Sequence, residues 1–227
     1  MKLYQDLHPS GEDTAVALGV FDGLHMGHRR VITAAMGGPE TPAVFTFQTD
    51  ILREGGKGAP VLLPQKRKLE LLGELGVKLC WSIPFSLIRE MEAERFVREV
   101  LVGVCRAKRV CCGFNFHFGK NGAGSVQDLV RLGEELGFSV TVQEPVLLAG
   151  KPVSSTRIRS LIAQGEIEEA NRLLGRPFSY DFPVEHGRQL GRTLGFPTVN
   201  QPIPPGFILP RFGVYAALGE VGGEKYY

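Results

Sequence analysis

The sequence predicts an α/β fold in which helices cover both faces of a parallel sheet, followed by a smaller β-rich module. Apolar runs alternate with amphipathic segments through roughly the first 160 residues, as strands and helices do in such folds. Two short helices follow, and helical periodicity then disappears while glycine and proline become frequent. The composition is that of a globular protein, because 43% of the 227 residues are hydrophobic and 22% are charged.

Five apolar runs are the predicted strands. They are Ala15–Phe21, Ala43–Phe47, Lys78–Ile83, Arg109–Phe114 and Ser139–Leu148. Ligands of a parallel sheet bind outside the carboxyl ends of its strands. We therefore expect the functional residues in the loops that follow these runs.

The predicted helices carry apolar residues at helical spacing. A first helix, Arg29–Met36, follows the first run, and Ser125–Asp128 has the pattern of a capping box at the start of a later helix. Two short helices, Ser155–Gln164 and Ile167–Leu174, lie on either side of Gly165. Three apolar stripes mark the others: Leu69, Leu72 and Leu75; Phe96, Val97, Val100, Leu101 and Val104; and Leu129, Leu132, Gly133 and Leu136.

A domain boundary is predicted near Arg176–Tyr180, which divides the chain into residues 1–178 and 179–227. The second part has fewer than about fifty residues, which is small for an independent core. Val214–Leu218 has the pattern of a strand, and Lys225–Tyr227 that of the interior of another. We therefore expect an incomplete β module.

Charge and hydropathy exclude several classes of function. The formal net charge is +2 with both signs scattered along the chain, which argues against a nucleic-acid partner. No apolar run reaches membrane-spanning length, and the N-terminus lacks the apolar region of a signal peptide. We expect a cytoplasmic protein with no membrane partner, and the sequence does not indicate its oligomeric state.

The four cysteines are predicted to be buried free thiols. They lack the spacing of metal ligands, and no histidine stands at zinc-ligand spacing from them. Cys111 and Cys112, as neighbours in a strand, should point to opposite faces of the sheet. No structural metal is expected at these residues, which include Cys80 and Cys105.

The most informative segment is the turn Gly19–His28, where the first predicted strand meets the first predicted helix. The start of a helix has unpaired N–H groups and a positive dipole end, which favour a phosphate. Two imidazoles three residues apart, His25 and His28, can donate hydrogen bonds to the charge that develops in phosphoryl transfer. The turn supplies further candidates for a phosphate site: Gly19, Phe21, Asp22, Gly23 and Gly27.

Other interpretations of this turn stay open. A zinc-binding pair would need further ligands, and two surface histidines could also stand at a turn of this kind. Neither of the common glycine-rich phosphate loops is present, since the sequence has no GxxxxGK[ST] and no GxGxxG after its first strand.

The HxGH pattern resembles the nucleotidylyltransferase superfamily, and the whole of Gly19–His28 resembles the bacterial FAD synthetase family, bifunctional riboflavin kinases and FMN adenylyltransferases. The resemblance implies a Rossmann-like nucleotidylyltransferase domain followed by a partial, riboflavin kinase-like β-barrel. It also implies that AMP is transferred from ATP to FMN, which yields FAD and pyrophosphate and requires Mg²⁺. His25 and His28 would stabilise the charge of the triphosphate.

Two further segments resemble the same family. Gly113–Gly119 resembles its G-x-[DN]-F-x-F-G element, which implies that Asn115 positions a phosphate and that Phe116 lies beside the flavin. Val153–Arg159 resembles its S-S-T-x-I-R element, which implies that Arg159 holds the triphosphate. A hydroxyl at this place can also simply cap a helix. The remaining ATP contacts would be Ser154, Ser155, Thr156 and Arg157.

Two loops near these segments are less regular. Phe45–Asp50 departs from the family, which usually has an acidic residue and prolines there, so Phe47 and Asp50 are flavin candidates by position only. The glycines after Phe118 predict a mobile loop that suits ligand gating. They are Gly119, Gly122 and Gly124.

The segment Gly187–Asn200 resembles the kinase part of the same family. The resemblance implies that Gly191, Thr198 and Asn200 bind nucleotide and Mg²⁺, and the oxygen atoms of the last two are ligands that Mg²⁺ prefers. The family's catalytic glutamate comes from a later segment. We therefore expect no kinase activity from this chain.

Two other functions remain open. The chain could transfer a nucleotidyl group to another phosphorylated acceptor, such as phosphopantetheine or nicotinate mononucleotide. It could also bind a flavin or a nucleotide without catalysis, which the altered Phe45–Asp50 loop would allow.

Overall fold

The computed structural model describes residues 1–49, 58–187, 190–196, 198–221 and 224–226, so that Asp50 lies outside the described residues. A six-stranded sheet has the order β1-β4-β3-β2-β5-β6, and every pair in it is parallel, as predicted. The strands are β1 Lys2–Tyr4, β2 Thr14–Leu18, β3 Thr41–Phe47, β4 Leu79–Ile83, β5 Ala107–Gly113 and β6 Ser139–Gln143.

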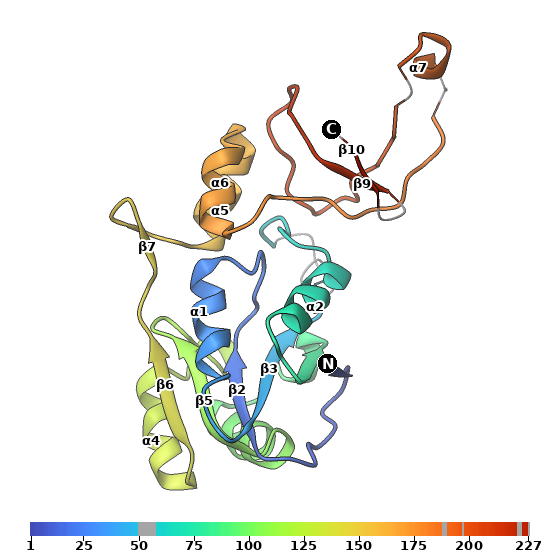
Figure 1. Cartoon of the computed structure of the whole chain (residues 1–227). Coiled ribbons are helices and arrows are strands. Elements are labelled where there is room, and N and C mark those ends of the chain that lie inside the picture. Colours follow the sequence, from blue (N-terminus) through green and yellow to red (C-terminus); the bar gives the residue numbers. More distant parts are fainter. Residues whose placement is uncertain (50–57, 188–189, 197, 222–223, 227) are drawn as a thin grey trace.

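The strand order reverses next to β2, because the chain continues from β2 to β3 and β4 on one side and returns to β5 and β6 on the other. Such a reversal leaves a crevice at the carboxyl ends of the two central strands, here β2 and β5. Figure 1 shows these ends directed toward α5 (Ser155–Gln164) and α6 (Ile167–Leu174). The topology therefore places the predicted loops around one crevice.

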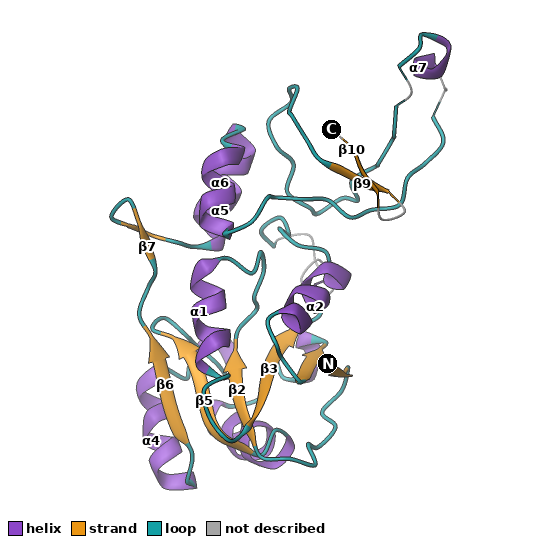
Figure 2. Ribbon diagram, in the orientation of Figure 1, coloured by secondary structure: helices purple, strands orange, loops and turns teal. Residues whose placement is uncertain are grey.

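Helices cover both faces of the sheet (Figure 2). On one face lie α1 (Met26–Ala34) and α2 (Gln65–Glu74), whose buried residues pack with Ala15 and Ala17 of β2. Val16 and Leu18 face the other side, toward the remaining helices. These are α3 (Ala93–Arg95), the π-helix η3 (Phe96–Val104) and α4 (Val126–Leu136). The alternation along β2 thus builds two separate cores.

Several predicted helix ends are confirmed. Ser125 caps α4 through the complete capping box with Asp128. The helices α5 and α6 have the predicted bounds, and Gly165 between them takes the left-handed conformation. Together they form a third apolar cluster with Leu62 and Val153. This cluster lies above the carboxyl edge of the sheet (Figure 1).

The predictions around the first strand and helix are wrong in their boundaries. The first strand ends at Leu18 rather than at Phe21, because Phe21 has a φ of 54° that no strand allows. The first helix begins at Met26 rather than at Arg29. The chain therefore leaves the sheet early, and most of the turn is free to form a site.

The predicted strand Ser139–Leu148 is two elements. The strand β6 ends at Gln143, and Leu147–Leu148 forms a separate antiparallel hairpin, β7, with β8 (Lys151–Pro152). Pro145 lies between β6 and β7, and a proline cannot donate to a sheet ladder. The sequence interpretation also missed β1, whose three residues are too few to show a pattern.

All four cysteines are buried and free, as predicted. Cys111 packs in the core beneath α1, whereas Cys112 packs in the core on the other face of the sheet. Burial raises the pKa of the Cys80 thiol to about 12, so this side chain is a neutral packing group. In the described parts of the chain, no helix is long and apolar enough to cross a membrane.

The residues after α6 carry little regular structure. They contain α7 (Leu190–Thr193) and an antiparallel pair formed by β9 (Gly219–Val221) and β10 (Glu224–Tyr226). The predicted strand Val214–Leu218 is wrong, because this segment has no ladder partner among the described residues and Val214 is fully exposed. The described residues therefore do not show the predicted partial barrel, and the domain boundary stays a prediction.

Two short 3₁₀ helices complete the described elements, η2 (Phe85–Leu87) and η4 (Lys120–Gly122). Both lie in connections that reach the carboxyl side of the sheet, after β4 and after β5.

Candidate active site

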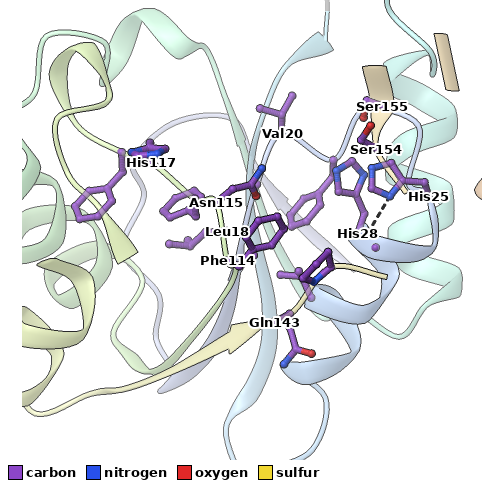
Figure 3. Close-up of a pocket in the computed structure, with 18 of the residues that line it drawn as sticks. Leu18, Val20, His25, His28, Phe114, Asn115, His117, Gln143, Ser154 and Ser155 are labelled. Atoms are coloured by element: carbon purple, nitrogen blue, oxygen red, sulfur yellow. Dashed lines mark hydrogen bonds between the residues drawn. The ribbon is translucent and has the colours of Figure 1, made fainter. Parts of the chain in front are cut away.

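A cavity of about 540 Å³ lies at the strand-order reversal. Its lining comes from the end of β3, from the segments after β2, β4, β5 and β6, and from the start of α5. A cavity of this size lies within the usual range for small-molecule sites. Figure 3 shows His25, His28, Ser154 and Ser155 gathered on one side, Asn115 near the middle and His117 on the opposite side.

The structure brings many of the predicted site residues to this cavity, from four separate segments of the chain. Those in the lining are Gly19, Phe21, His25, Gly27, His28, Phe47, Asn115, Phe116, Ser154 and Ser155. The others among the described residues of the first 178 are outside the lining: Asp22, Gly23, Thr156, Arg157 and Arg159.

The two histidines form one rigid unit at the start of α1. His25 is the N-cap residue, and its Nδ1 accepts a hydrogen bond from the backbone N–H of His28 at 3.3 Å (dashed in Figure 3). The two rings stack with centroids 3.6 Å apart, and the Phe21 ring stands nearly perpendicular to the His28 ring with centroids 5.4 Å apart. The bond to Nδ1 leaves the proton of neutral His25 on Nε2, so Nε2 is a donor.

Both imidazoles are neutral at pH 7. Burial lowers the pKa of His25 to about 4, and the positive charges of Arg176 and Arg159 act in the same direction. Burial also holds the pKa of His28 well below its ordinary value, with further lowering by His25, Lys68 and Arg159. An anion in the cavity finds two fixed neutral donors backed by positive charge.

We expect the free energy of unfolding to fall as the pH is lowered from 6.5 to 4. The pKa of His25 is lower in the folded protein than in the unfolded chain, so only the unfolded chain binds the proton in this range. The loss from His25 alone is about 2 kcal/mol at pH 5. Urea unfolding of the protein and of His25→Gln at several pH values measures it.

The variant should lose much of this slope below pH 6.5. Equal slopes for the two proteins would show that the folded state does not keep His25 neutral.

Asp22 and Arg159 lie together beneath the turn. The Asp22 carboxylate accepts from the backbone N–H of Leu62 at 3.0 Å and pairs with Nη2 of Arg159 at 2.6 Å. The Ser155 hydroxyl donates to the Asp22 carbonyl oxygen at 2.9 Å, which ties the start of α5 to the turn. Burial raises the pKa of Asp22, and the charge of Arg159 opposes that rise. The pair therefore joins two predicted ATP segments to each other.

The other end of the cavity is aromatic. Phe47 and Phe85 meet edge to face at 5.0 Å, and Phe116 stacks on Phe118 at 5.8 Å. Phe118 is buried in the core, whereas Phe114 is half exposed at the cavity. This end suits a large flat ring system, such as the flavin that the resemblance implies beside Phe116.

Sequence reasoning missed several lining residues. Phe85, Ile88 and Phe96 come from the connection after β4, and only the fold brings them to the crevice. The lining segment Gln143–Val146 was hidden within the overlong predicted strand. Lys68 is outside the lining, is 1% exposed and donates to the carbonyl oxygen of Phe47, a lining residue, at 2.6 Å. Lys68 lies on the apolar face of α2, three and four residues before two leucines. This spacing could have predicted from the sequence that Lys68 is buried.

The glycine-rich loop after β5 is braced by the protein. Phe118 and Gly124 exchange two backbone hydrogen bonds, and the Lys120 N–H donates to the Met91 carbonyl oxygen at 2.7 Å. Gly119 has φ 74° and ψ 178°, a region that only glycine adopts readily. A Cβ on Gly119 would lie 2.7 Å from the backbone of Ala93. Position 119 therefore requires glycine, because its backbone lies close to the backbone of α3.

Replacing Gly119 by alanine should therefore destabilise the protein by about 2 kcal/mol or more, through backbone strain and the clash with Ala93. Thermal and urea unfolding measure the change. Gly122→Ala is the matched control, because Gly122 also has a positive φ but a Cβ there would meet its nearest atom at 3.6 Å. Equal losses in the two variants would contradict the role of close packing.

The predicted kinase-module residues lie apart from this cavity. Gly191, Thr198 and Asn200 are absent from its lining, and the last two are exposed. The Asn200 carbonyl oxygen accepts from the backbone N–H of Glu185 at 2.8 Å. Within the described ranges, no three His, Cys, Asp or Glu side chains converge as a metal site.

Comparison with known proteins gives two family matches. Residues 7–157 match the model of the FAD synthetase family, and residues 174–227 match that of riboflavin kinase. A bifunctional riboflavin kinase/FMN adenylyltransferase of Listeria monocytogenes is 37% identical over 93% of this chain and 69% of the relative. The enzyme of the same name from Escherichia coli K12 is 32% identical over 99% of this chain and 75% of the relative.

Two solved structures are similar. A crystal structure named as a macrolide-efflux protein from Streptococcus pneumoniae has a TM-score of 0.86 and 28% identity, and the match covers 99% of this chain and 76% of the other. A pantoate-beta-alanine ligase from Francisella tularensis has a TM-score of 0.51 and 14% identity, covering 86% and 85%. The second likeness shows the fold alone.

Proposed function

This chain belongs to the FAD synthetase family, and we propose that it transfers the adenylyl group of ATP to the phosphate of FMN, giving FAD and pyrophosphate. The observation that carries the proposal is the stacked pair His25–His28 at the start of α1, which opens on a cavity at the strand-order reversal. Neutral donors beside a helix N-terminus suit an anionic group whose charge grows during the reaction.

The reaction needs positioning and charge stabilisation rather than a covalent nucleophile on the protein. An oxygen of the FMN phosphate attacks the α-phosphorus of ATP, and the bond from this phosphorus to the β-phosphate oxygen breaks. Pyrophosphate leaves with the electron pair. His25 and His28 donate to the phosphate oxygens as charge accumulates, and Asn115 positions the phosphate of the nucleotide or of the flavin.

The two ends of the cavity suit the two substrates. The aromatic end, with Phe47 and Phe116, would bind the isoalloxazine ring of FMN. The histidine end, with Ser154 and Ser155 at the start of α5, would bind the phosphates of ATP.

Further residues would form the phosphate side of the site. Gly19, Phe21 and Gly27 form the wall beside the histidines. Thr156 is exposed in the first turn of α5, where its hydroxyl can reach a phosphate. Arg159 would hold the β- and γ-phosphates after exchanging its contact with Asp22 for them.

We propose that Mg²⁺ enters with ATP rather than as a resident metal. The described side chains offer no converging group of three carboxylates, histidines or cysteines, so the protein's own donors do not fit a closed metal site. Mg²⁺ in such enzymes is commonly held by substrate phosphates and a few protein oxygens. It would neutralise charge on the triphosphate.

Release of pyrophosphate from ATP and FMN tests the proposed function. The purified chain should form FAD and pyrophosphate in equal amounts, and neither product should form without FMN. Phosphopantetheine and nicotinate mononucleotide are the control acceptors. Turnover of a control acceptor with none of FMN would make the chain a transferase for another substrate, and ligand binding without turnover would make it a binding protein.

The residues that match riboflavin kinase form a separate part of the proposal. Gly191, Thr198 and Asn200 are proposed contacts for nucleotide and Mg²⁺ in that module. The match to the riboflavin kinase family over residues 174–227 supports kinase activity of this module. Conversion of radiolabelled riboflavin to FMN with ATP measures it directly.

We place the protein in the cytoplasm. All four of its cysteines are buried thiols without a disulfide, which suits a reducing compartment. ATP is also supplied there.

A further inference from the structure

The β7–β8 hairpin lies between β6 and α5 at the carboxyl side of the sheet (Figure 1). Its two pairs are Leu147 with Pro152 and Leu148 with Lys151. The turn between them consists of Ala149 and Gly150, both with positive φ (52° and 71°), as two-residue hairpin turns require. A hairpin this short is not stable by itself in water. Other parts of the protein must hold it.

The two arms of the hairpin are part of the cavity wall. Gln143–Val146 leads into the hairpin and Pro152–Ser155 leads out of it, and both segments line the cavity. The Val153 N–H donates to the Val146 carbonyl oxygen at 2.8 Å, which joins the arms at their base. The position of the hairpin therefore sets the position of this wall relative to the histidine pair.

Arg157, in the first turn of α5, holds the hairpin across its end. Its Nη1 donates to the carbonyl oxygens of Leu148 and Lys151, both at 3.2 Å, so one guanidinium group bridges the two strands next to the turn. Its Nη2 pairs with Glu169 of α6 at 3.5 Å. Arg157 is outside the cavity lining. These three interactions direct the guanidinium group to the hairpin and to α6 rather than to the cavity.

The cavity wall formed by the two arms of the hairpin is suited to a nucleoside. Pro145, Val146 and Val153 present apolar groups to the cavity, and the carboxylate of Glu144 would repel a phosphate. The phosphate donors lie at the start of α1 and at Ser154 and Ser155, where the second arm meets α5. The apolar part of the arms therefore suits the adenosine part of ATP, with its flat base and neutral sugar.

We propose that Arg157 is a positioning residue, which clamps the β7–β8 hairpin so that its arms fit the adenosine part of ATP. This replaces the role of direct ATP contact that the sequence predicts for Arg157. The proposal rests on the proposed function in that ATP is the nucleotide bound. The clamp itself is a property of the protein without substrate, and can be measured without it.

The first measurement is amide hydrogen exchange in the substrate-free full chain. Arg157→Ala should speed exchange at Leu148 and Val153 about tenfold, while the amides of α4 stay unchanged and show that the fold is intact. Arg157→Lys should give an intermediate rate, because an ammonium group cannot bridge both carbonyls as a guanidinium does. Arg172→Ala is the matched control: Arg172 pairs with the same Glu169 at 3.2 Å but has no contact with the hairpin.

The second measurement separates positioning from phosphate contact, with AMP and pyrophosphate as the probes. Arg157→Ala should weaken AMP binding and raise the KM for ATP about tenfold, while kcat and pyrophosphate binding change less than about twofold. Arg157→Lys should recover part of the AMP affinity. Unchanged exchange in the hairpin, or a loss of pyrophosphate binding equal to that of AMP, would overturn the proposal.

These outcomes also separate the clamp from the proposed function. If the chain transfers AMP to another acceptor, the exchange and AMP results stand and only the FAD assay fails. If the chain binds neither AMP nor ATP, the proposed function fails, and the exchange measurement alone decides whether Arg157 clamps the hairpin.

Discussion

Replacing His28 by alanine is expected to lower kcat for FAD formation about 100-fold, the usual cost of losing one preorganised donor to a transition state. The ring of His28 is fixed between His25 and Phe21, so it needs no reorganisation when charge develops on the phosphate. Because its low pKa keeps the imidazole neutral, the donor is present throughout the neutral pH range.

The variant should fold normally. The Nδ1 atom of His28 is buried without a hydrogen-bond partner among the described residues, so alanine removes an unsatisfied polar atom along with the ring. Steady-state kinetics with ATP and FMN, together with thermal unfolding, provide the measurements. His8→Ala is the control, because His8 stacks on Tyr4 away from the cavity. A kcat near that of the wild type would refute the role of His28.

The predictable parts of the fold are those whose signals lie close together in the sequence. The bounds of α5 and α6 could be predicted because Ser154 caps the first and glycines end both. Five of the six strands of the sheet could be predicted, since buried parallel strands are continuous apolar runs. The same signal extended β6 through the β7 hairpin, because an apolar run does not show where hydrogen bonds change partners. Pro145 was the local signal that β6 ends before the hairpin begins.

The site divides in a similar way. His25 and His28 could be predicted because one turn holds both the donors and the helix start that positions them. Phe85 and Phe96 carry no local signal for a site, and only the strand order brings their segment to the cavity. Arg157 shows the opposite case. Its motif suggests a ligand contact, whereas its hydrogen bonds go to the carbonyl oxygens of the hairpin.

Replacing Asp22 by alanine is expected to lower the free energy of unfolding by about 3 kcal/mol, the low end of the cost of removing one partner from a buried ion pair, because Arg159 is only partly buried. The variant leaves the guanidinium of Arg159, whose side chain is 18% exposed, without its carboxylate. It also leaves the backbone N–H of Leu62 without an acceptor. The attraction between the charges does not set this cost, because the pKa of Asp22 is raised by burial in spite of Arg159. The loss of stability comes from the two groups left without a partner, the Arg159 guanidinium and the Leu62 N–H.

Urea unfolding of three variants separates these contributions. Asp22→Asn keeps an oxygen for the Leu62 N–H and lacks only the charge, so it should lose about half as much stability as Asp22→Ala. Asp13→Ala breaks an ion pair with Arg106 whose side chains are 45% and 52% exposed, and it should cost less than about 1 kcal/mol. If Asp22→Ala cost no more than Asp13→Ala, the Asp22–Arg159 pair would not hold the turn to α5. Arg159 would then be free to bind phosphate without first giving up a structural partner.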